Sequence, residues 1–270
     1  MDTIEVSIQV QNELLKELLI AELSNLQFDA FVEEDALLKA YIKADVFNET
    51  ELNFILNKND LNYSLSIIKD QNWNQLWESN FAPVIVDDFV GVRAEFHEKI
   101  EGVVHEILIT PKMSFGTGHH ATTFLVMQLM RKIDFKGKSV YDFGTGTGIL
   151  AILAEKLGAG KVLAVDNDDW CIENSLENIQ KNNSQVIEIH KVEDAKSNFK
   201  FDTILANINR NIIEDNISYL VDSLKNNSQL ILSGLLESDE AAIVRLCENY
   251  QLKHIKTEKK NGWIAILLER

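Results

Sequence analysis

The chain has 270 residues and carries 42 acidic against 26 basic side chains, which gives a formal net charge of −16 at pH 7. A chain this acidic is poorly suited to binding nucleic acid through a general phosphate-neutralising surface, whereas it can attract a basic protein partner. The same acidity is equally compatible with simply keeping a protein in solution.

Cysteine content and terminal sequence bear on the compartment. Cys171 and Cys247 are far apart and form no CxxC pair, so we expect two reduced thiols. The N-terminal stretch lacks the basic and apolar regions of a signal peptide, and no apolar run has the length of a membrane span. We therefore expect a cytoplasmic protein.

The first 69 residues predict a small α+β domain. Alternating apolar residues indicate strands at 3–10, 28–35, 36–45 and 63–69. Helical spacing marks 11–26, and Asn48 is a candidate N-cap for a second helix. The order strand, helix, strand, strand, helix, strand is typical of ferredoxin-like domains. We interpret residues 1–69 as a recognition domain, since no catalytic constellation occurs there.

Residues 70–82 predict an interdomain linker helix. Trp73 and Trp77 are four residues apart and would share one face of that helix. We favour the interpretation that both rings pack the linker onto a neighbouring domain. A role in forming a cleft between domains is the alternative.

Residues 83–270 predict a second, larger domain. After three strand-like stretches between Pro83 and Pro111, strands and helices alternate from residue 139 onward. Such alternation predicts a parallel sheet with helices on both faces. The last two strands are joined by KNGW, a turn signal that predicts an antiparallel hairpin at the end of the sheet.

The first strand–helix turn of this alternation is the glycine-rich stretch YDFGTGTGILA, with Gly144, Gly146 and Gly148. Glycines allow a sharp turn and a close approach of main-chain amides to a ligand, and the helix that follows offers unpaired N–H groups. The turn is not a P-loop, because no Lys-Ser or Lys-Thr pair follows it. Gly146, Gly148 and Ala151 do fit the G-x-G-x-x-A pattern of dinucleotide sites.

Two acids favour S-adenosylmethionine over a dinucleotide as the ligand. Asp142 completes the pattern D-x-G-x-G-x-G and can hold an ammonium group through neighbouring groups or water. Asp166 ends the next strand, where it can accept hydrogen bonds from ribose hydroxyls, a role that NAD enzymes also use. The alternative for Asp142 is a solvated strand-end carboxylate. The alternative for Asp166 is a charge at a helix start, which Asp168 and Asp169 serve better.

The stretch FGTGHHATT, residues 115–123, is compatible with a metal site, a phosphate loop or a cover over a cofactor. A metal site is disfavoured, because the adjacent His119 and His120 cannot easily share one tetrahedral ion and no third ligand has matching spacing. We expect no metal.

Five motifs in order, FGTGHHATT, DFGTGTGILAI, VDNDD, LANI and LSGLL, resemble the bacterial ribosomal protein L11 methyltransferase (PrmA) family. The resemblance is specific from about Gln71 to the C-terminus and weaker before it. It implies a Rossmann-like class I S-adenosylmethionine-dependent methyltransferase domain that follows a small ferredoxin-like domain.

The resemblance also assigns residues. It implies that the 115–123 segment folds over the cofactor, with Phe115 lining it, Thr123 hydrogen-bonding it, and Gly116 and Gly118 giving the loop freedom. Ala121 stands where many members have proline. It further implies cofactor contacts from residues of the glycine turn and the strand ends, namely Gly144, Gly146, Asp166 and Asn207.

Asn207 is the expected catalytic residue. It resembles the Asn of the (N/D)PPY motif of amino-group methyltransferases, with Ile208 and Asn209 in place of the prolines. Its side-chain carbonyl, with nearby main-chain carbonyls, can accept hydrogen bonds from a substrate amine and orient the nitrogen lone pair. The alternative is an Asn that satisfies a strand–helix turn.

The resemblance implies that the substrate is ribosomal protein L11, methylated on lysine side chains and on its N-terminal α-amine. Methyl transfer needs a neutral amine, and no obligate general base is evident. Three rival functions remain: a methyltransferase for another protein or a small amine, a nicotinamide-dependent oxidoreductase, and a non-catalytic binding module.

Overall fold

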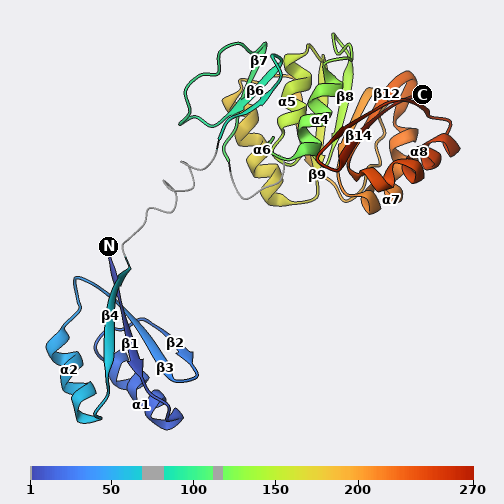
Figure 1. Ribbon diagram of the computed structural model, residues 1–270. Coiled ribbons are helices and arrows are strands. Elements are labelled where there is room, and N and C mark those ends of the chain that lie inside the picture. Colours follow the sequence, from blue (N-terminus) through green and yellow to red (C-terminus); the bar gives the residue numbers. More distant parts are fainter. Residues whose placement is uncertain (1, 69–81, 112–117) are drawn as a thin grey trace. The chain divides into compact units, whose positions relative to one another are not determined.

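A computed structural model describes residues 2–68, 82–111 and 118–270 of the chain. The chain divides into two compact units, Met1–Asn80 and Phe81–Arg270 (Figure 1). Each unit has a hydrophobic core of its own. The predicted linker helix, with Trp73 and Trp77, falls outside the described residues except for Ala82.

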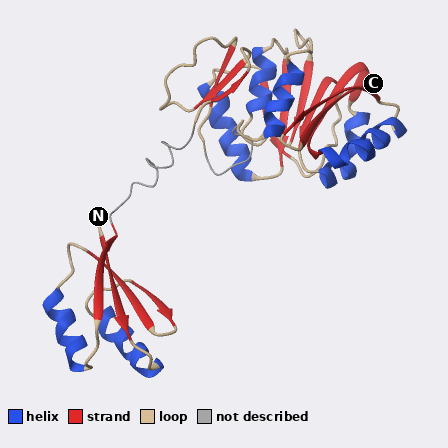
Figure 2. Ribbon diagram, in the orientation of Figure 1, coloured by secondary structure: helices blue, strands red, loops and turns tan. Residues whose placement is uncertain are grey.

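The N-terminal unit pairs an antiparallel sheet with two helices (Figure 2). Its elements are β1 (Thr3–Gln9), α1 (Glu13–Ser24), β2 (Ala30–Glu34), β3 (Leu37–Lys43), α2 (Glu49–Lys58) and β4 (Tyr63–Ile68). The sheet order is β2-β3-β1-β4, and the element order is the one predicted from the sequence. Asn48 caps α2 as predicted, because its side chain accepts hydrogen bonds from the N–H groups of Thr50 and Glu51.

The second unit begins with a small sheet of β5 (Val84–Val86), β6 (Val90–Arg93) and β7 (His105–Leu108). β5 and β6 are antiparallel, whereas β6 and β7 are parallel. These strands correspond to the three strand-like stretches between Pro83 and Pro111.

A seven-stranded sheet forms the centre of the second unit. Its strands are β8 (Ser139–Phe143), β9 (Lys161–Asp166), β10 (Ile187–Lys191), β11 (Phe201–Asn207), β12 (Leu224–Leu236), β13 (Lys253–Lys260) and β14 (Trp263–Glu269). The helices are α4 (Ala121–Met130), α5 (Ile149–Lys156), α6 (Asp169–Lys181), α7 (Arg210–Asp222), the 3₁₀ turn Glu237–Asp239 and α8 (Glu240–Asn249). The sheet order is β10-β9-β8-β11-β12-β14-β13.

The strand directions confirm the predicted topology. β8 to β12 pair in parallel, and β14 runs antiparallel to both β12 and β13. In the hairpin turn Asn261 has φ 52° and Gly262 has φ 80°. A tight two-residue hairpin turn favours positive φ at both central residues, which confirms the hairpin predicted from KNGW.

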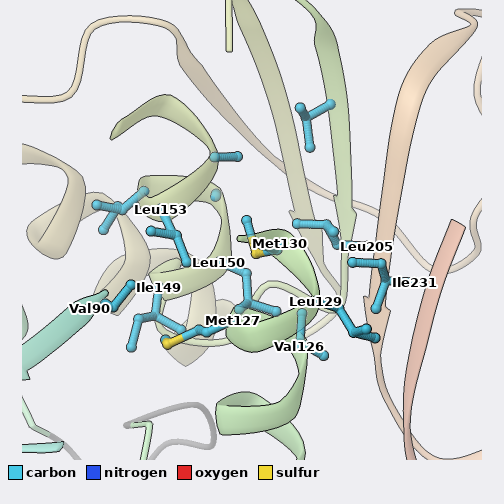
Figure 3. Close-up of a cluster of buried hydrophobic side chains, with 14 of the residues drawn as sticks. Val90, Val126, Met127, Leu129, Met130, Ile149, Leu150, Leu153, Leu205 and Ile231 are labelled. Atoms are coloured by element: carbon cyan, nitrogen blue, oxygen red, sulfur yellow. The ribbon is translucent and has the colours of Figure 1, made fainter. Parts of the chain in front are cut away.

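Buried apolar side chains cover both faces of the large sheet. On one face α4 and α5 pack against the strands, and Figure 3 shows Met127, Leu150, Leu205 and Ile231 among them. On the other face a second cluster joins the strands to α7 and α8. The chain leaves β8 toward β9 and β10 on one side and returns beside β8 as β11. Ligands of such sheets bind at this switch of strand order, at the carboxyl ends of the strands.

Within the described parts of the chain, no helix combines the length and apolar character that a membrane span requires.

Candidate functional site

The glycine turn lies between β8 and α5, at the predicted edge of the sheet. Gly144, Gly146 and Gly148 have φ of 77°, 56° and 78°, a left-handed conformation that glycine adopts at no steric cost. The N–H groups of Gly144 and Thr145 both donate to the carbonyl of Val165 at 2.9 Å. The turn is thereby fastened to the end of β9.

The side chain of Asp166 also bonds to the glycine turn. One carboxylate oxygen accepts a hydrogen bond from the N–H of Gly146 at 2.9 Å, and the other accepts from the N–H of Asp168 at 3.1 Å. Asp168 itself caps α6 by accepting from the N–H of Trp170 at 2.9 Å. The helix start therefore has its own acid, as expected, and Asp166 holds the glycine turn.

Asp142 is buried beneath the turn, with 1% of its surface exposed. Its Oδ2 accepts a hydrogen bond from Thr145 Oγ1 at 2.6 Å, while its Oδ1 is buried and finds no partner among the described residues. Burial is the main cause that raises the pKa of this carboxyl to about 7, and the nearby charge of Asp166 contributes in the same direction. A solvated strand-end carboxylate is therefore excluded, and Asp142 is a buried acid with an unused oxygen.

The structure brings Thr123 and Asn207 together. Thr123 lies in the first turn of α4 with 2% of its surface exposed, and Asn207 is the last residue of β11. Asn207 Nδ2 donates a hydrogen bond to Thr123 Oγ1 at 3.2 Å across 84 positions of sequence. The two predicted site residues thus share one contact at the carboxyl end of the sheet.

Because the Nδ2 group of Asn207 is bonded to Thr123, the side-chain carbonyl oxygen of Asn207 is available to accept a hydrogen bond. No described residue donates a hydrogen bond to that oxygen, and the side chain is half-buried rather than fully enclosed. The amide bonds to α4 and not to its own strand–helix turn, where Asn209 is the N-cap of α7. The turn-satisfying alternative for Asn207 does not hold in this structure.

The motif that contains Phe115 and Thr123 is described only in part. Phe115 and Gly116 lie outside the described residues, so their predicted roles stay predictions. Gly118 has φ 89°, and His120 caps α4 with Nδ1, which lies 2.8 Å from Thr122 Oγ1. The His120 ring also meets the Trp263 ring edge-on, with 4.6 Å between centroids. His120 therefore anchors the start of the helix that carries Thr123.

The two adjacent histidines of this motif contact different groups. His119 Nε2 lies 2.8 Å from the carbonyl oxygen of Ala82, so the adjacent histidines contact different partners. Across residues 2–68, 82–111 and 118–270, no three His, Cys, Asp or Glu side chains are grouped as metal ligands.

Three asparagines on one face of α6 were not predicted from the sequence. Asn174, Asn178 and Asn182 bond to main-chain groups of β7 and the residues after it, and the first two are fully buried. Asn178 accepts from the N–H of Thr110 at 2.7 Å and donates to the carbonyl of Thr147 at 2.8 Å. It thereby ties the glycine turn to the strand end that leads into residues 112–117. The three asparagines are spaced four residues apart and so share one face of the helix, which is the signal that the sequence offered for them.

We expect Asn178→Ala to lower the free energy of unfolding by about 3 kcal/mol, because the buried carbonyl of Thr147 and the partly buried N–H of Thr110 each lose their partner. Cofactor affinity should fall as well, since Thr147 belongs to the glycine turn. Chemical denaturation and ligand titration check this, with the exposed Gln180→Ala on the same helix as control. Equal stability of the two variants would contradict a bracing role for Asn178.

A cavity of about 350 Å³ lies elsewhere in this unit. Its lining includes Ser139, Lys161, Phe201 and Lys225, which stand at the amino ends of their strands. The lining extends along β9 to Val165, but it includes no residue of the glycine turn, nor Asp166, nor Asn207.

The comparison with known families decides the relationship. The sequence model of the family "Ribosomal protein L11 methyltransferase (PrmA)" matches residues 2–270. The chain belongs to the PrmA family. The match covers both units, whereas the motifs quoted from the sequence were specific only from about Gln71 onward.

Individual PrmA relatives agree with this assignment. A ribosomal protein L11 methyltransferase of Porphyromonas gingivalis is 40% identical over 263 residues, which cover 94% of this chain and 90% of the relative. One from Bacteroides fragilis is 37% identical over 262 residues, 94% of each chain. The crystal structure of a ribosomal protein L11 methylase from Lactobacillus delbrueckii subsp. bulgaricus has a TM-score of 0.66 at 30% identity. The similarity covers 70% of this chain and 99% of that one.

Proposed function

We propose that this chain is an S-adenosylmethionine-dependent protein N-methyltransferase that methylates lysine side chains and the N-terminal α-amine of ribosomal protein L11. Membership of the PrmA family supports this substrate. The relatives that match 94% of the chain are also named for it. The observation that carries the chemistry is the contact between Asn207 and Thr123 at the carboxyl edge of the sheet.

The glycine turn and the two acids fit such a cofactor. The turn lets a ligand approach its main chain without an obstructing Cβ, and the unpaired Oδ1 of Asp142 offers a buried hydrogen-bond acceptor near it. When bound, S-adenosylmethionine supplies a methyl group on a positively charged sulfur, already activated for transfer. Asp142 would face its ammonium group directly or through water, and Asp166 would accept from the ribose hydroxyls.

Asn207 would act on the substrate amine. Its carbonyl oxygen accepts an N–H hydrogen bond and so orients the nitrogen lone pair, while Thr123 holds the other end of the amide. An amine in this partly desolvated place has a lowered pKa, which favours its neutral, nucleophilic form. The protein contributes position and electrostatics, and we assign no general base.

The N-terminal unit would present the substrate. It is a separately folded α+β unit, consistent with a recognition domain over residues 1–69 that precedes a linker at 70–82 and the methyltransferase domain at 83–270. A net charge of −16 suits a basic ribosomal protein and disfavours nucleic acid as a direct ligand. We place the enzyme in the cytoplasm, acting without a metal and away from membranes.

The test is incubation of the purified chain and purified ribosomal protein L11 with S-adenosylmethionine, read by mass spectrometry of L11 peptides. We expect methyl groups on lysines and on the α-amine, and suppression by S-adenosylhomocysteine. Transfer only to other proteins or small amines would favour the first alternative. Binding of NAD(P)H with no response to S-adenosylhomocysteine would favour the oxidoreductase.

A further inference from the structure

Gly234 lies in β12, beside the end of β11 where Asn207 stands. Its φ is +83°, and the pairing of β12 with β14 shifts register between Ser233 and Leu235. A left-handed glycine at a register shift marks a β-bulge, a feature that often redirects a chain near an active site. The bulge falls next to Ser233, the residue paired with Asn207 in the sheet.

The bulge brings two main chains unusually close. A Cβ atom at Gly234 would lie 2.1 Å from the carbonyl oxygen of Ile208 and 2.7 Å from its carbonyl carbon. The N–H of Ile208 also donates to the carbonyl of Ser233 at 3.1 Å. Since the obstructed atoms belong to the main chain, no rotamer change can make room for a side chain at position 234.

Gly144 approaches the same residue from the other neighbouring strand. A Cβ at Gly144 would lie 2.3 Å from Cγ2 of Ile208, a side-chain atom. β8 and β12 flank β11 in the sheet, so the residue after Asn207 sits between two glycines. Gly144 is predicted to contact the cofactor, whereas Gly234 belongs to neither the glycine turn nor the predicted cofactor contacts.

We infer that Gly234 is a positioning residue for methyl transfer. Its missing side chain lets the main chain of Ile208 pack against β12, and this placement fixes Asn207 where its amide meets Thr123. This inference rests on the proposed function, because it assigns Gly234 an effect on the step that Asn207 serves.

The experiment compares Gly234→Ala with Gly262→Ala. Both glycines have similar φ, +83° and +80°, but a Cβ at Gly262 meets nothing within 4 Å. Both alanines therefore carry the same backbone strain, and only one displaces Ile208. We expect Gly234→Ala to lower kcat about a hundredfold, as misplacement of a reacting group by about 1 Å does. Gly262→Ala should keep kcat within about threefold, a change worth under 1 kcal/mol.

The readouts separate positioning from a loss of folded protein. Each kcat is expressed per site titrated with S-adenosylhomocysteine, so unfolded molecules are not counted. The affinity of Gly234→Ala for that ligand should change little. A general structural defect would lower this affinity together with kcat. Equal kcat in the two alanine variants would overturn the inference, whereas an inactive wild-type chain would overturn the proposed function instead.

Ile208→Ala supplies a second arm. In Gly144→Ala the new Cβ would clash with Cγ2 of Ile208. Ile208→Ala removes that atom, so the double variant should regain part of the kcat that Gly144→Ala loses. Ile208→Ala should not restore the kcat of Gly234→Ala, because there the new Cβ clashes with the main chain of Ile208. Rescue of Gly234→Ala by Ile208→Ala would contradict the inference.

Discussion

Asn207→Ala should reduce methyl transfer at least about a hundredfold while retaining much of the cofactor affinity. The alanine removes the acceptor that orients the substrate amine, and loss of one such aligned polar group costs about 10² to 10³ in kcat. It leaves the glycine turn, Asp142 and Asp166 intact. Turnover on ribosomal protein L11 and titration with S-adenosylhomocysteine measure the two quantities separately.

Asn209→Ala is the matched control for this change. Asn209 lies two residues further on, is exposed, and makes no side-chain capping hydrogen bond as the N-cap of α7. We expect its kcat to stay within about threefold of the wild type, a difference below 1 kcal/mol. Undiminished turnover in Asn207→Ala would remove this residue from the mechanism.

Asp142→Asn should stabilise the chain at alkaline pH and weaken cofactor binding. The pKa of Asp142 rises from 3.8 to about 7 on folding, because burial disfavours its charged form. The folded state therefore binds this proton more tightly than the unfolded state. Stability from this group is complete below pH 4 and is lost as the pH rises toward 7, by about 4 kcal/mol in total.

The amide variant lacks this titration, so its stability should change less between pH 5 and pH 8 than that of the wild type. Because a neutral amide cannot balance an ammonium group, its affinity for S-adenosylhomocysteine should fall about tenfold or more. Denaturant unfolding at both pH values and calorimetric titration check the two effects. Parallel stability profiles of the two proteins would show that Asp142 does not titrate in this range.

Local signals in the sequence were sufficient to predict the helices and strands and the edge of the sheet at which the site lies. Asn48 and Asp168 cap their helices because a short polar side chain can accept the first free N–H groups. The KNGW turn fixed the final hairpin through Asn261 and Gly262. Asp166 was predicted from its place at a strand end in a parallel sheet, whereas the role of Asn207 was predicted from the resemblance to amino-group methyltransferases.

Features that depend on tertiary contacts escaped prediction. The main-chain partners of Asn178 lie 31 and 68 positions away in sequence, so its bracing role has no local signature. Gly234 reads as one more glycine until the close approach of Ile208 is known. The burial of Asp142 likewise depends on the helices and strands packed over it.

The most direct measurement is calorimetric titration of the whole chain with S-adenosylhomocysteine and, separately, with NADH at pH 7.5. If the glycine turn between Asp142 and Asp166 is a methyl-donor site, the sulfur nucleoside should bind with one site per chain and NADH should give no heat of binding. Saturable binding of NADH, with none of S-adenosylhomocysteine, would contradict the account.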